Sequence, residues 1–498
     1  MTRLNVLLLV WDACRLDYAR EHAPTLASLG NESLWFENAI TAAGHSLSSH
    51  VSMMTGTYPS EHGIFHQQHM IDELPLLDDL NDAGYTRYGV SANGFASPMY
   101  GFDDGFDEFY NTQGQMVFPE GLDVHRYGRT VREENEGEFD ADSVSYTDLL
   151  RATLRHERPL RSGVNVAAAG LSELVGSKPV LQRIPHPRFS PISEFCYSPE
   201  KNTQRIQSIL ERESDSDSPF FLFANYMDTH HPYAPPEQYQ RQYCGRTLPF
   251  RELSDLNERA HPWTYFEALE AGDQPDEAFH ETIRDLYAGE VRSADDHLRQ
   301  ILEVLDREGM REETLIVVTA DHGENLGETD RMGETRMGHV ASASEHMLRV
   351  PLVVAHPELP GDDIEQHVSL RRLRSLLRPG NLEGGSPGRD ALLQDDGTVA
   401  SQVPVLNGET ICDRYPRVPE ETVRRQLSVM YRDGWKIVVG SNGDEVAWLD
   451  GEQRKVDDTP EELVGGCRRN LRALVQQGTG ERELSSSERA HLEALGYL

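Results

Sequence analysis

The sequence predicts an α/β fold built around a mixed, mostly parallel sheet that is flanked by helices. Four continuous apolar runs have the composition of strands buried on both faces of such a sheet. They span residues 4–12, 219–228, 313–321 and 349–357. Apolar residues also recur at three- and four-residue spacing from Ile283 to Leu305, which predicts an amphipathic helix with a C-cap near Gly309. Helix followed by strand is the repeating unit of layered α/β proteins.

Two further regions differ from this core. Residues 110–215 contain charged connectors and helix-like stretches, and we interpret them as an insertion that folds over the edge of the sheet. Beyond a glycine-rich linker, polarity alternates and Asp-Gly and Asn-Gly turns occur at 433–434 and 442–443, as in the hairpins of a small antiparallel sheet. We therefore expect a large α/β domain that carries the chemistry over 1–395 and a C-terminal subdomain over 396–498.

The chain is strongly acidic. Asp and Glu number 83 against 47 Lys and Arg, so the formal net charge is -36, and only four of the basic residues are lysine. Such a surface stays hydrated in molar salt, where the Debye length is roughly 3 Å, and we expect a halophilic protein. An ordinary acidic mesophilic enzyme is the alternative. Nucleic acid is not an expected partner, because no basic stripe is present to neutralise phosphates.

Cysteine usage and hydropathy favour a cytoplasmic protein. The five cysteines are scattered and form no C-x-x-C pair, which indicates free thiols in a reducing compartment. The N-terminal apolar run has only about eight residues and no small-residue cleavage site, unlike a signal peptide. No stretch of roughly 18 apolar residues occurs, so we expect no membrane span.

Acidic residues follow three of the four predicted strands, at Asp12, Asp228 and Asp321. Ligands of open α/β sheets bind beyond the carboxyl ends of the strands, so carboxylates at this edge are candidates for chemistry. Asp321 is followed by His322, and a carboxylate with an imidazole suits Mn²⁺ or Zn²⁺, whereas Ca²⁺ prefers oxygen ligands. We expect one divalent ion (Mn, Ca or Zn) held by Asp12, Asp321 and His322.

The segment HSLSSHVSMMTGTYPSEHG, residues 45–63, is dense in hydroxyl and imidazole groups. Ser46 is a candidate nucleophile, because a serine hydroxyl becomes reactive when a base or a metal lowers its pKa. A loop that enters a helix also directs backbone N–H groups toward an anion. The alternative is that Ser46, Ser48 and Ser49 only cap a helix. Taken alone, the segment leaves both interpretations open.

Six motifs together resemble the sulfatase family of the alkaline phosphatase superfamily, in the family's order and across almost the whole chain. They are NVLLLVWDACRLD, SLSSHVSMMTGTYPSEHG, MDTHHPYAPP, TADHGE, LRVPLVV and the terminal LEALGYL. The resemblance implies an alkaline-phosphatase-like fold and a metal-dependent hydrolase of sulfate or phosphate esters. It places Ser46 at the nucleophile position and also among the residues that contact the metal.

The resemblance also implies roles for residues around the transferred group. Asp12, Asp321 and His322 fall at metal positions, and His230 falls where a group can protonate the leaving oxygen. The expected substrate-binding residues are Arg15, His50, Asn93 and His339. An arginine and protonated histidines near a metal would stabilise charge on a sulfuryl or phosphoryl group.

Departures from the ordinary family pattern resemble one branch of the superfamily. They are Ala13 in place of a second aspartate, His322 in place of an asparagine, Ser48 and His50 within the formylglycine maturation signature, and His339 in place of a lysine. Phosphonate monoester hydrolases and phosphoglycerol transferases share such features, and an unmodified serine or threonine can attack in them. We therefore expect Ser46 to be unmodified.

Three classes of function are consistent with these residues. The leading hypothesis is a hydrolase in which Ser46 attacks a small anionic ester, or a sulfated or phosphorylated glycan, and water releases the covalent seryl intermediate. The alternative is a phosphodiesterase or a transferase that passes a phospho-group to an acceptor hydroxyl. An inactive binding module is the third class, and the joint presence of Ser46, Asp12, Asp321 and His322 argues against it.

The charge balance yields a prediction about salt. With a net charge of -36, the fold should lose stability as salt falls from molar to about 0.1 M, because repulsion is then screened only over about 10 Å. Thermal melts across this range should show a steadily falling Tm. A Tm that does not change would show that the acidic composition is not an adaptation to salt.

Overall fold

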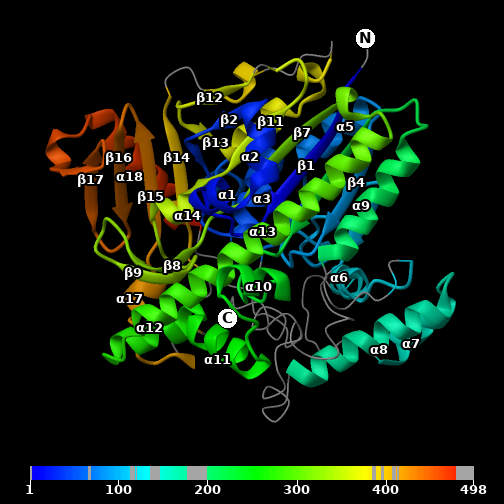
Figure 1. Cartoon of the computed structure of the whole chain (residues 1–498), viewed down its shortest axis with the longest axis horizontal. Helices are drawn as coiled ribbons and strands as arrows, with labels where there is room; N and C mark the ends of the chain where they lie inside the picture. The colour runs from blue at the N-terminus through cyan, green and yellow to red at the C-terminus, as the bar shows by residue number, and fades with distance from the viewer. Residues whose placement is uncertain are drawn as a thin grey trace.

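The computed structural model describes residues 3–477 except 66–68, 113–117, 119, 135–145, 177–198, 360, 384–388, 394–396, 406–410 and 412–413. Within these residues the central sheet has eight strands in the order β12-β2-β11-β7-β1-β6-β4-β5 (Figure 1). In chain order the strands are β1 (Asn5–Trp11), β2 (Leu34–Phe36), β4 (Thr86–Ser91), β5 (Glu108–Asn111), β6 (Phe220–Tyr226), β7 (Thr314–Thr319), β11 (Leu352–Ala355) and β12 (Asp362–Ile364). The predicted mixed, mostly parallel sheet is confirmed.

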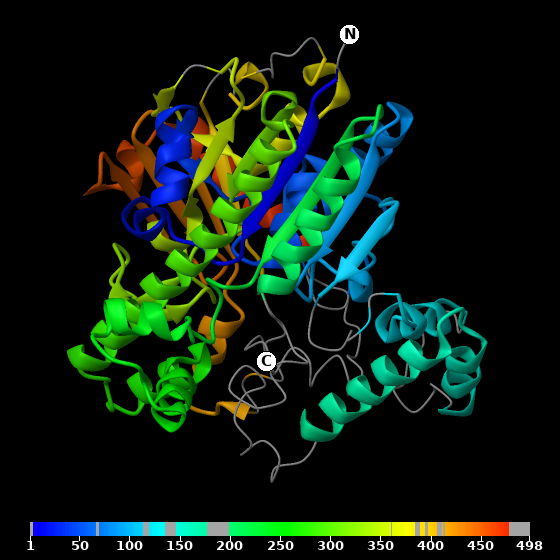
Figure 2. The same ribbon diagram turned by 45° about the vertical axis from the view of Figure 1, so that its right-hand side comes forward.

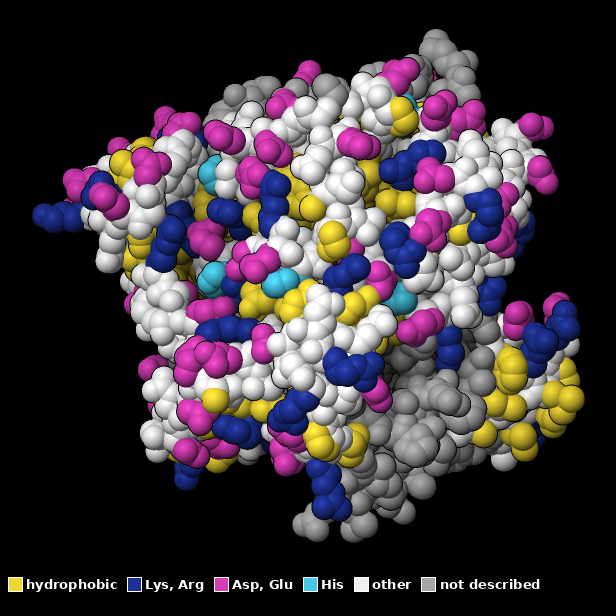
Figure 3. Space-filling model, viewed as in Figure 1, with side chains coloured by type: hydrophobic (Ala, Val, Ile, Leu, Met, Phe, Trp, Pro, Cys, Tyr) yellow, Lys and Arg dark blue, Asp and Glu magenta, His cyan; other side chains and the backbone are white. Residues whose placement is uncertain are grey.

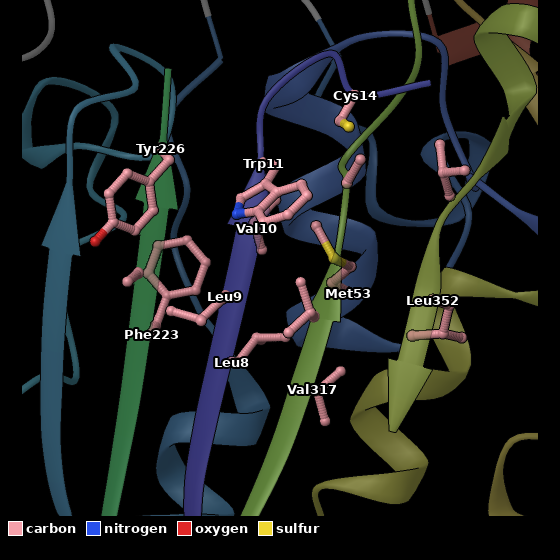
Figure 4. Packing of buried hydrophobic residues seen from close by; sticks show 14 of the residues in the cluster. Leu8, Leu9, Val10, Trp11, Cys14, Met53, Phe223, Tyr226, Val317 and Leu352 are labelled. Atoms are coloured by element: carbon pink, nitrogen blue, oxygen red, sulfur yellow. The ribbon is translucent and has the colours of Figure 1, made fainter. Parts of the chain in front are cut away.

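Strand β1 lies at the centre of this sheet. It pairs in parallel with β6 on one side and with β7 on the other, so that Leu8 lies opposite both Phe223 and Val317. Neighbouring strands and helices on both faces leave no more than 1% of any side chain from Val6 to Trp11 exposed. Figure 4 shows how closely these side chains pack. Complete burial of apolar surface is the main stabilising contribution at this position.

The fourth predicted run divides at Pro351. Proline has no backbone N–H and interrupts the ladder, so the run forms β10 (Arg349–Val350), which pairs with β3 (Ala39–Ile40), and then β11. Strand β11 joins the main sheet antiparallel to β7.

Helices cover both faces of the sheet. The long helix predicted around 283–305 is α13 (Glu277–Arg307), and it packs beside α9 (Pro199–Glu213) in front of the sheet in Figure 2. Gly309 follows with φ +71°, and its N–H donates to the Asp306 carbonyl, as expected for a C-cap. Met53 of α3 (Ser46–Thr55) packs against the strands from behind (Figure 4). The other helices near the site are α1 (Leu16–His22), α2 (Pro24–Asn31), α10 (Glu237–Tyr243), α11 (Phe250–Ala260), α12 (Pro262–Glu270) and α14 (Glu345–Leu348).

The C-terminal subdomain is a five-stranded antiparallel sheet covered by one helix. Its elements are β14 (Val399–Val403), β15 (Leu427–Arg432), β16 (Trp435–Gly440), β17 (Glu445–Leu449), β18 (Glu452–Arg454) and α18 (Glu461–Gln477). The turn predicted at 433–434 joins β15 to β16 with φ values of +50° and +79°, and the turn predicted at 442–443 joins β16 to β17. Ile40 and Met347 of the large domain share an apolar cluster with Val399 and Leu427. The motif at 492–498 lies outside the described residues.

The described part of the predicted insertion is helical. It contains α6 (Val124–Glu134), α7 (Tyr146–Arg155), α8 (Pro159–Gly176) and α9, of which α9 covers the sheet beside α13 and α7 and α8 form a hairpin. In Figures 1 and 2 this hairpin lies beyond the carboxyl ends of the parallel strands.

Over the residues that the structure describes, no helix has the length and apolar character that crossing a bilayer requires. The three cysteines in this part of the chain, Cys14, Cys244 and Cys467, are free.

Candidate active site

The carboxyl ends of β1 and β7 bring the predicted metal ligands together. Asp12 follows β1 directly, and Asp321 and His322 follow β7, its neighbour in the sheet. One ligand atom from each of the three residues lies within 4.8 Å of the other two, and all three side chains are fully buried. Adjacent parallel strands therefore place distant parts of the sequence at one point.

The carboxylates fit a cation. Oδ1 of Asp321 accepts hydrogen bonds from the backbone N–H groups of Ala13, at 3.1 Å, and His322, at 2.9 Å. Oδ2 of Asp321 and Oδ1 of Asp12 are buried and accept no hydrogen bond within the described part of the chain. Burial and the neighbouring Asp321 raise the pKa of Asp12 well above its ordinary value. A cation between the two oxygens would reverse that effect, so the donor set suits a divalent ion.

The orientation of His322 makes its ring a potential ligand. Its Nδ1 lies 2.9 Å from the carbonyl oxygen of Gly323, which can only accept, so Nδ1 carries the hydrogen. In this tautomer the lone pair is on Nε2, which lies 3.6 Å from Asp321 Oδ2. Fixing one ring nitrogen on a carbonyl is the usual way in which proteins orient a metal-binding imidazole.

Ser46 is the first residue of α3, and its hydroxyl faces this cluster. Its Oγ lies 3.3 Å from Asp12 Oδ2 and 3.2 Å from His322 Nε2. The N-cap position is occupied by His45, which makes no side-chain capping bond. The hydroxyls of Ser48 and Ser49 bond to the carbonyls of Ile64 and Asp321. The geometry therefore gives Ser46 a position beside the carboxylates, at the positive end of the helix dipole.

Asn93 and His50 approach the cluster from other elements. The amide nitrogen of Asn93, in the loop after β4, donates to Asp12 Oδ2. His50 lies one turn after Ser46, with Nδ1 donating to the Ser46 carbonyl at 2.8 Å and Nε2 lying 3.3 Å from the amide nitrogen of Asn225. Burial lowers the pKa of His50. Both ring nitrogens of His50 are thus engaged by the protein.

His230 and His339 form a second group beside His322. The ring of His339 lies 4.3 Å from the His322 ring and 5.1 Å from the His230 ring, measured between centroids. Burial and the neighbouring His339 lower the pKa of His230 to about 3, and burial also lowers the pKa of His339 far below its ordinary value. The sequence suggested protonated histidines here, but these buried rings are neutral near pH 7.

Arg15 lies at the start of α1, away from these contacts. Its guanidinium donates to both carboxylate oxygens of Asp17, and it donates to Glu328 Oε1 at 2.6 Å. It also lies 2.9 Å from Nδ1 of His346. The Arg15 side chain is therefore paired with protein carboxylates, and among the described residues it makes no hydrogen bond or ion pair with Asp12, Asp321 or His322.

Glu324 is a site residue to which the sequence assigned no role. It is fully buried, its Oε1 lies 3.2 Å from His339 Nδ1, and its Oε2 accepts a hydrogen bond from the Tyr233 hydroxyl at 3.2 Å. Burial raises the pKa of Glu324 to about 7. The signal was present in the motif TADHGE, where this carboxylate follows the metal-type histidine by two positions. Asn225 lies within the predicted strand 219–228, and no motif in the sequence indicated that its amide reaches the site.

The fold and the cluster together define the class of protein. The phosphonate monoester hydrolase of Silicibacter pomeroyi has the same fold, with a TM-score of 0.59, 17% identity, and coverage of 95% of this chain and 96% of that chain. The family model described as Sulfatase matches residues 5–373 of this chain. The chain belongs to the sulfatase family, within the alkaline phosphatase superfamily, and it is an ester hydrolase.

Two curated proteins are similar to this chain in sequence. One is the multifunctional alkaline phosphatase superfamily protein PehA of Trinickia caryophylli, which is 26% identical over 384 residues, or 71% of this chain and 68% of PehA. The other is the iduronate 2-sulfatase of Mus musculus, which is 28% identical over 175 residues, or 32% of each chain. The similarity thus extends to proteins named for sulfate esters and to one named as multifunctional.

Gly323 tests how tightly the His322 loop is held. Its N–H donates to the Met347 carbonyl at 2.8 Å, and a Cβ at this position would lie 1.9 Å from the His346 carbonyl oxygen. Gly323→Ala should therefore displace the loop, lower stability by about 1–3 kcal/mol and weaken divalent-metal binding. Gly128→Ala on α6 is the control, because nothing lies within 4 Å of the added carbon. Equal melting temperatures and equal metal affinities for the two variants would contradict this packing.

Asp321 tests the metal site itself. Asp321→Ala should reduce bound divalent metal at least about tenfold, as measured by elemental analysis after gel filtration, because it removes the buried Oδ2. Ester hydrolysis should be lost with it. Asp228→Ala is the matched control, since Asp228 is also buried at a strand end but lies 3.9 Å from His297 instead. Full metal occupancy in Asp321→Ala would overturn the assignment.

Proposed function

We propose that this chain hydrolyses small anionic sulfate or phosphate esters with unmodified Ser46 as the nucleophile. The observation that carries the proposal is the position of the Ser46 hydroxyl, 3.2 Å from His322 Nε2 and 3.3 Å from Asp12 Oδ2. Asp12 Oδ2 can accept the hydroxyl proton, a divalent ion held at His322 would lower the pKa of the hydroxyl, and the N-terminus of α3 favours the negative charge that then develops on Oγ.

The reaction proceeds in two displacements. In the first, a bond forms between Ser46 Oγ and the sulfur or phosphorus atom while the ester bond to the leaving oxygen breaks, and the proton lost from Oγ is balanced by a proton taken up by the leaving oxygen. In the second, water attacks the same centre, the bond to Oγ breaks, and Ser46 regains a proton. A divalent ion held by Asp12, Asp321 and His322 would supply electrostatic stabilisation of the anionic groups at this point.

The surrounding residues serve this reaction in different ways. His230 donates Nδ1–H to the His231 carbonyl, so Nε2 must first accept a proton before the ring can protonate a leaving oxygen. Asn93 donates to Asp12 Oδ2, the His339 ring lies 4.3 Å from the His322 ring, and these two residues are the proposed contacts of the transferred group. Arg15 and His50 were also predicted to bind substrate. In this proposal they act indirectly, because Arg15 is hydrogen-bonded to Glu328 and His50 is hydrogen-bonded to the Ser46 carbonyl.

The substrate class follows from the relatives and from the nucleophile. The iduronate 2-sulfatase is named for a sulfated sugar acid, which supports a sulfated or phosphorylated glycan as one substrate type. The residues at the maturation positions, Ser48 and His50, favour a plain serine, which suits phosphoryl transfer at least as well as sulfuryl transfer. A phosphodiester is therefore the second candidate, and a panel of aryl sulfate, phosphate monoester and phosphate diester substrates in molar salt distinguishes them.

The setting of the enzyme is also part of the proposal. The charge of -36 with only four lysines supports function in concentrated salt. The free cysteines among the described residues support a reducing compartment, for which the cytoplasm is the proposal.

Ser46→Ala tests the nucleophile. It should lower kcat about a thousandfold or more on any ester that the native protein cleaves, because no other hydroxyl takes the place of Oγ in the two displacements. Ser52→Ala on the same helix is the control, since the Ser52 hydroxyl bonds to His62 and not to the cluster. Near-normal turnover by Ser46→Ala would overturn the role of Ser46.

Peptide mass spectrometry over residues 45–58 tests the unmodified state. We expect the mass of the encoded peptide, because the maturation signature is broken. A loss of two hydrogens at Ser46 would show an aldehyde and would contradict this part of the proposal, while leaving the hydrolase assignment to the kinetic test.

A further inference from the structure

Exposed apolar side chains are concentrated on the α7–α8 hairpin, residues 146–176. Of the five exposed large apolar residues in the described part of the chain, four lie here, and Leu160 is 88% exposed. The four are Leu150, Leu154, Leu160 and Val164. Yellow side chains gather on this hairpin at the lower right of Figure 3. A monomeric protein in water rarely keeps such a concentration of apolar surface without a partner.

The hairpin is inverted relative to an ordinary surface helix. Among the side chains of α8 that the structure describes, residues 159–168, the buried ones are the polar Ser162 and Asn165, whereas Leu160 and Val164, one turn apart, face outward. Asn165 donates to the Phe118 carbonyl at 2.8 Å and accepts from the Phe118 N–H at 2.8 Å, and Ser162 accepts from the Leu122 N–H at 2.9 Å. Polar bonds thus hold the hairpin to the body and leave its apolar stripe outside.

Arginines lie directly beside this apolar stripe. Each exposed leucine is followed by an exposed arginine, in the pairs Leu150-Arg151, Leu154-Arg155 and Leu160-Arg161. On a helix the following residue is rotated by about 100°, so the arginines line one flank of the leucines. Only two acidic residues, Asp148 and Glu157, stand among the described side chains of the hairpin, although the whole chain carries -36. Arg151 pairs with Asp148 at 2.7 Å and Arg161 with Glu120 at 2.8 Å, and the described side chains of the hairpin still carry more arginines than acidic residues.

We propose that the α7–α8 hairpin docks the protein on the surface of an anionic lipid bilayer. Leucines that enter the boundary of headgroups and acyl chains, with arginines beside them at the phosphates, are the pattern of interfacial helices. A second copy is a poorer occupant, because two hairpins that met through this face would bring their arginine rows together. The acidic remainder of the chain would be repelled from the same lipid surface, which leaves the hairpin as the point of contact.

Docking would also orient the active site. The hairpin lies beyond the sheet edge at which β1 and β7 end, on the side of Asp12 and Asp321 (Figures 1 and 2). A bilayer bound there would face this edge and not the opposite one. The inference goes beyond ester hydrolysis and does not depend on it, since binding is measured without substrate.

The test is sedimentation of the full chain with vesicles of one part phosphatidylglycerol to three parts phosphatidylcholine, against vesicles of phosphatidylcholine alone. We expect binding to the anionic vesicles and a partition coefficient that falls about fivefold for each of Arg151→Gln, Arg155→Gln and Arg161→Gln. Salt should be the lowest at which the melt shows a folded chain. Arg251→Gln, an exposed arginine on α11, is the charge control and should bind as the native chain does.

A matched valine pair tests the apolar contribution. Val164 on the hairpin and Val475 on α18 are both 42% exposed. Replacing either valine by serine therefore removes a similar amount of exposed apolar surface. Val164→Ser should lower vesicle binding roughly fivefold, and Val475→Ser should leave it unchanged. No binding to anionic vesicles, or equal losses for the two valine variants, would overturn the proposal. So would light scattering that shows a dimer which Leu160→Ser dissociates, because the face would then belong to a second copy.

Discussion

Two carboxylates held out of water, Asp12 and Asp321, are the constraint on which the site depends. They lie at the ends of adjacent parallel strands, and like charges in a medium of low dielectric constant repel strongly. The N–H of Ala13, the amide of Asn93 and the ring of His322 surround them. Pairing β1 with β7 therefore carries an electrostatic cost that a bound cation offsets, and this links the proposed metal site to the stability of the sheet.

The histidines follow from the same constraint. His322, His50 and His230 each donate Nδ1–H to a backbone carbonyl, which fixes the tautomer and leaves Nε2 with its lone pair. An imidazole fixed in this way offers Nε2 as a ligand or as a proton acceptor. In the proposed reaction, positive potential for an anionic substrate would come from a divalent ion and from the N-terminus of α3, with the imidazoles setting geometry and proton transfer.

The parts of this arrangement that could be predicted are those encoded locally. Asp12 and Asp321 were found because continuous apolar runs mark buried strands, and parallel strands end at one edge of the sheet. The turn at 433–434 was found because Asp-Gly favours positive φ at both positions. The partners of Arg15 could not be found in this way, because Glu328 reaches it from 313 positions away and only the tertiary fold selects that contact.

The two proposals, function in high salt and docking on lipid, would impose compatible demands on this chain. In molar salt, screening over roughly 3 Å weakens both the repulsion within the acidic surface and the attraction of arginines to phosphates. Salting-out ions strengthen apolar burial under the same conditions. A hairpin that relied on arginine alone would therefore release the bilayer as salt rises, whereas Leu150, Leu154 and Leu160 would hold it. In this proposal the leucine–arginine pairs would provide one contribution that dominates at low salt and another that persists at high salt.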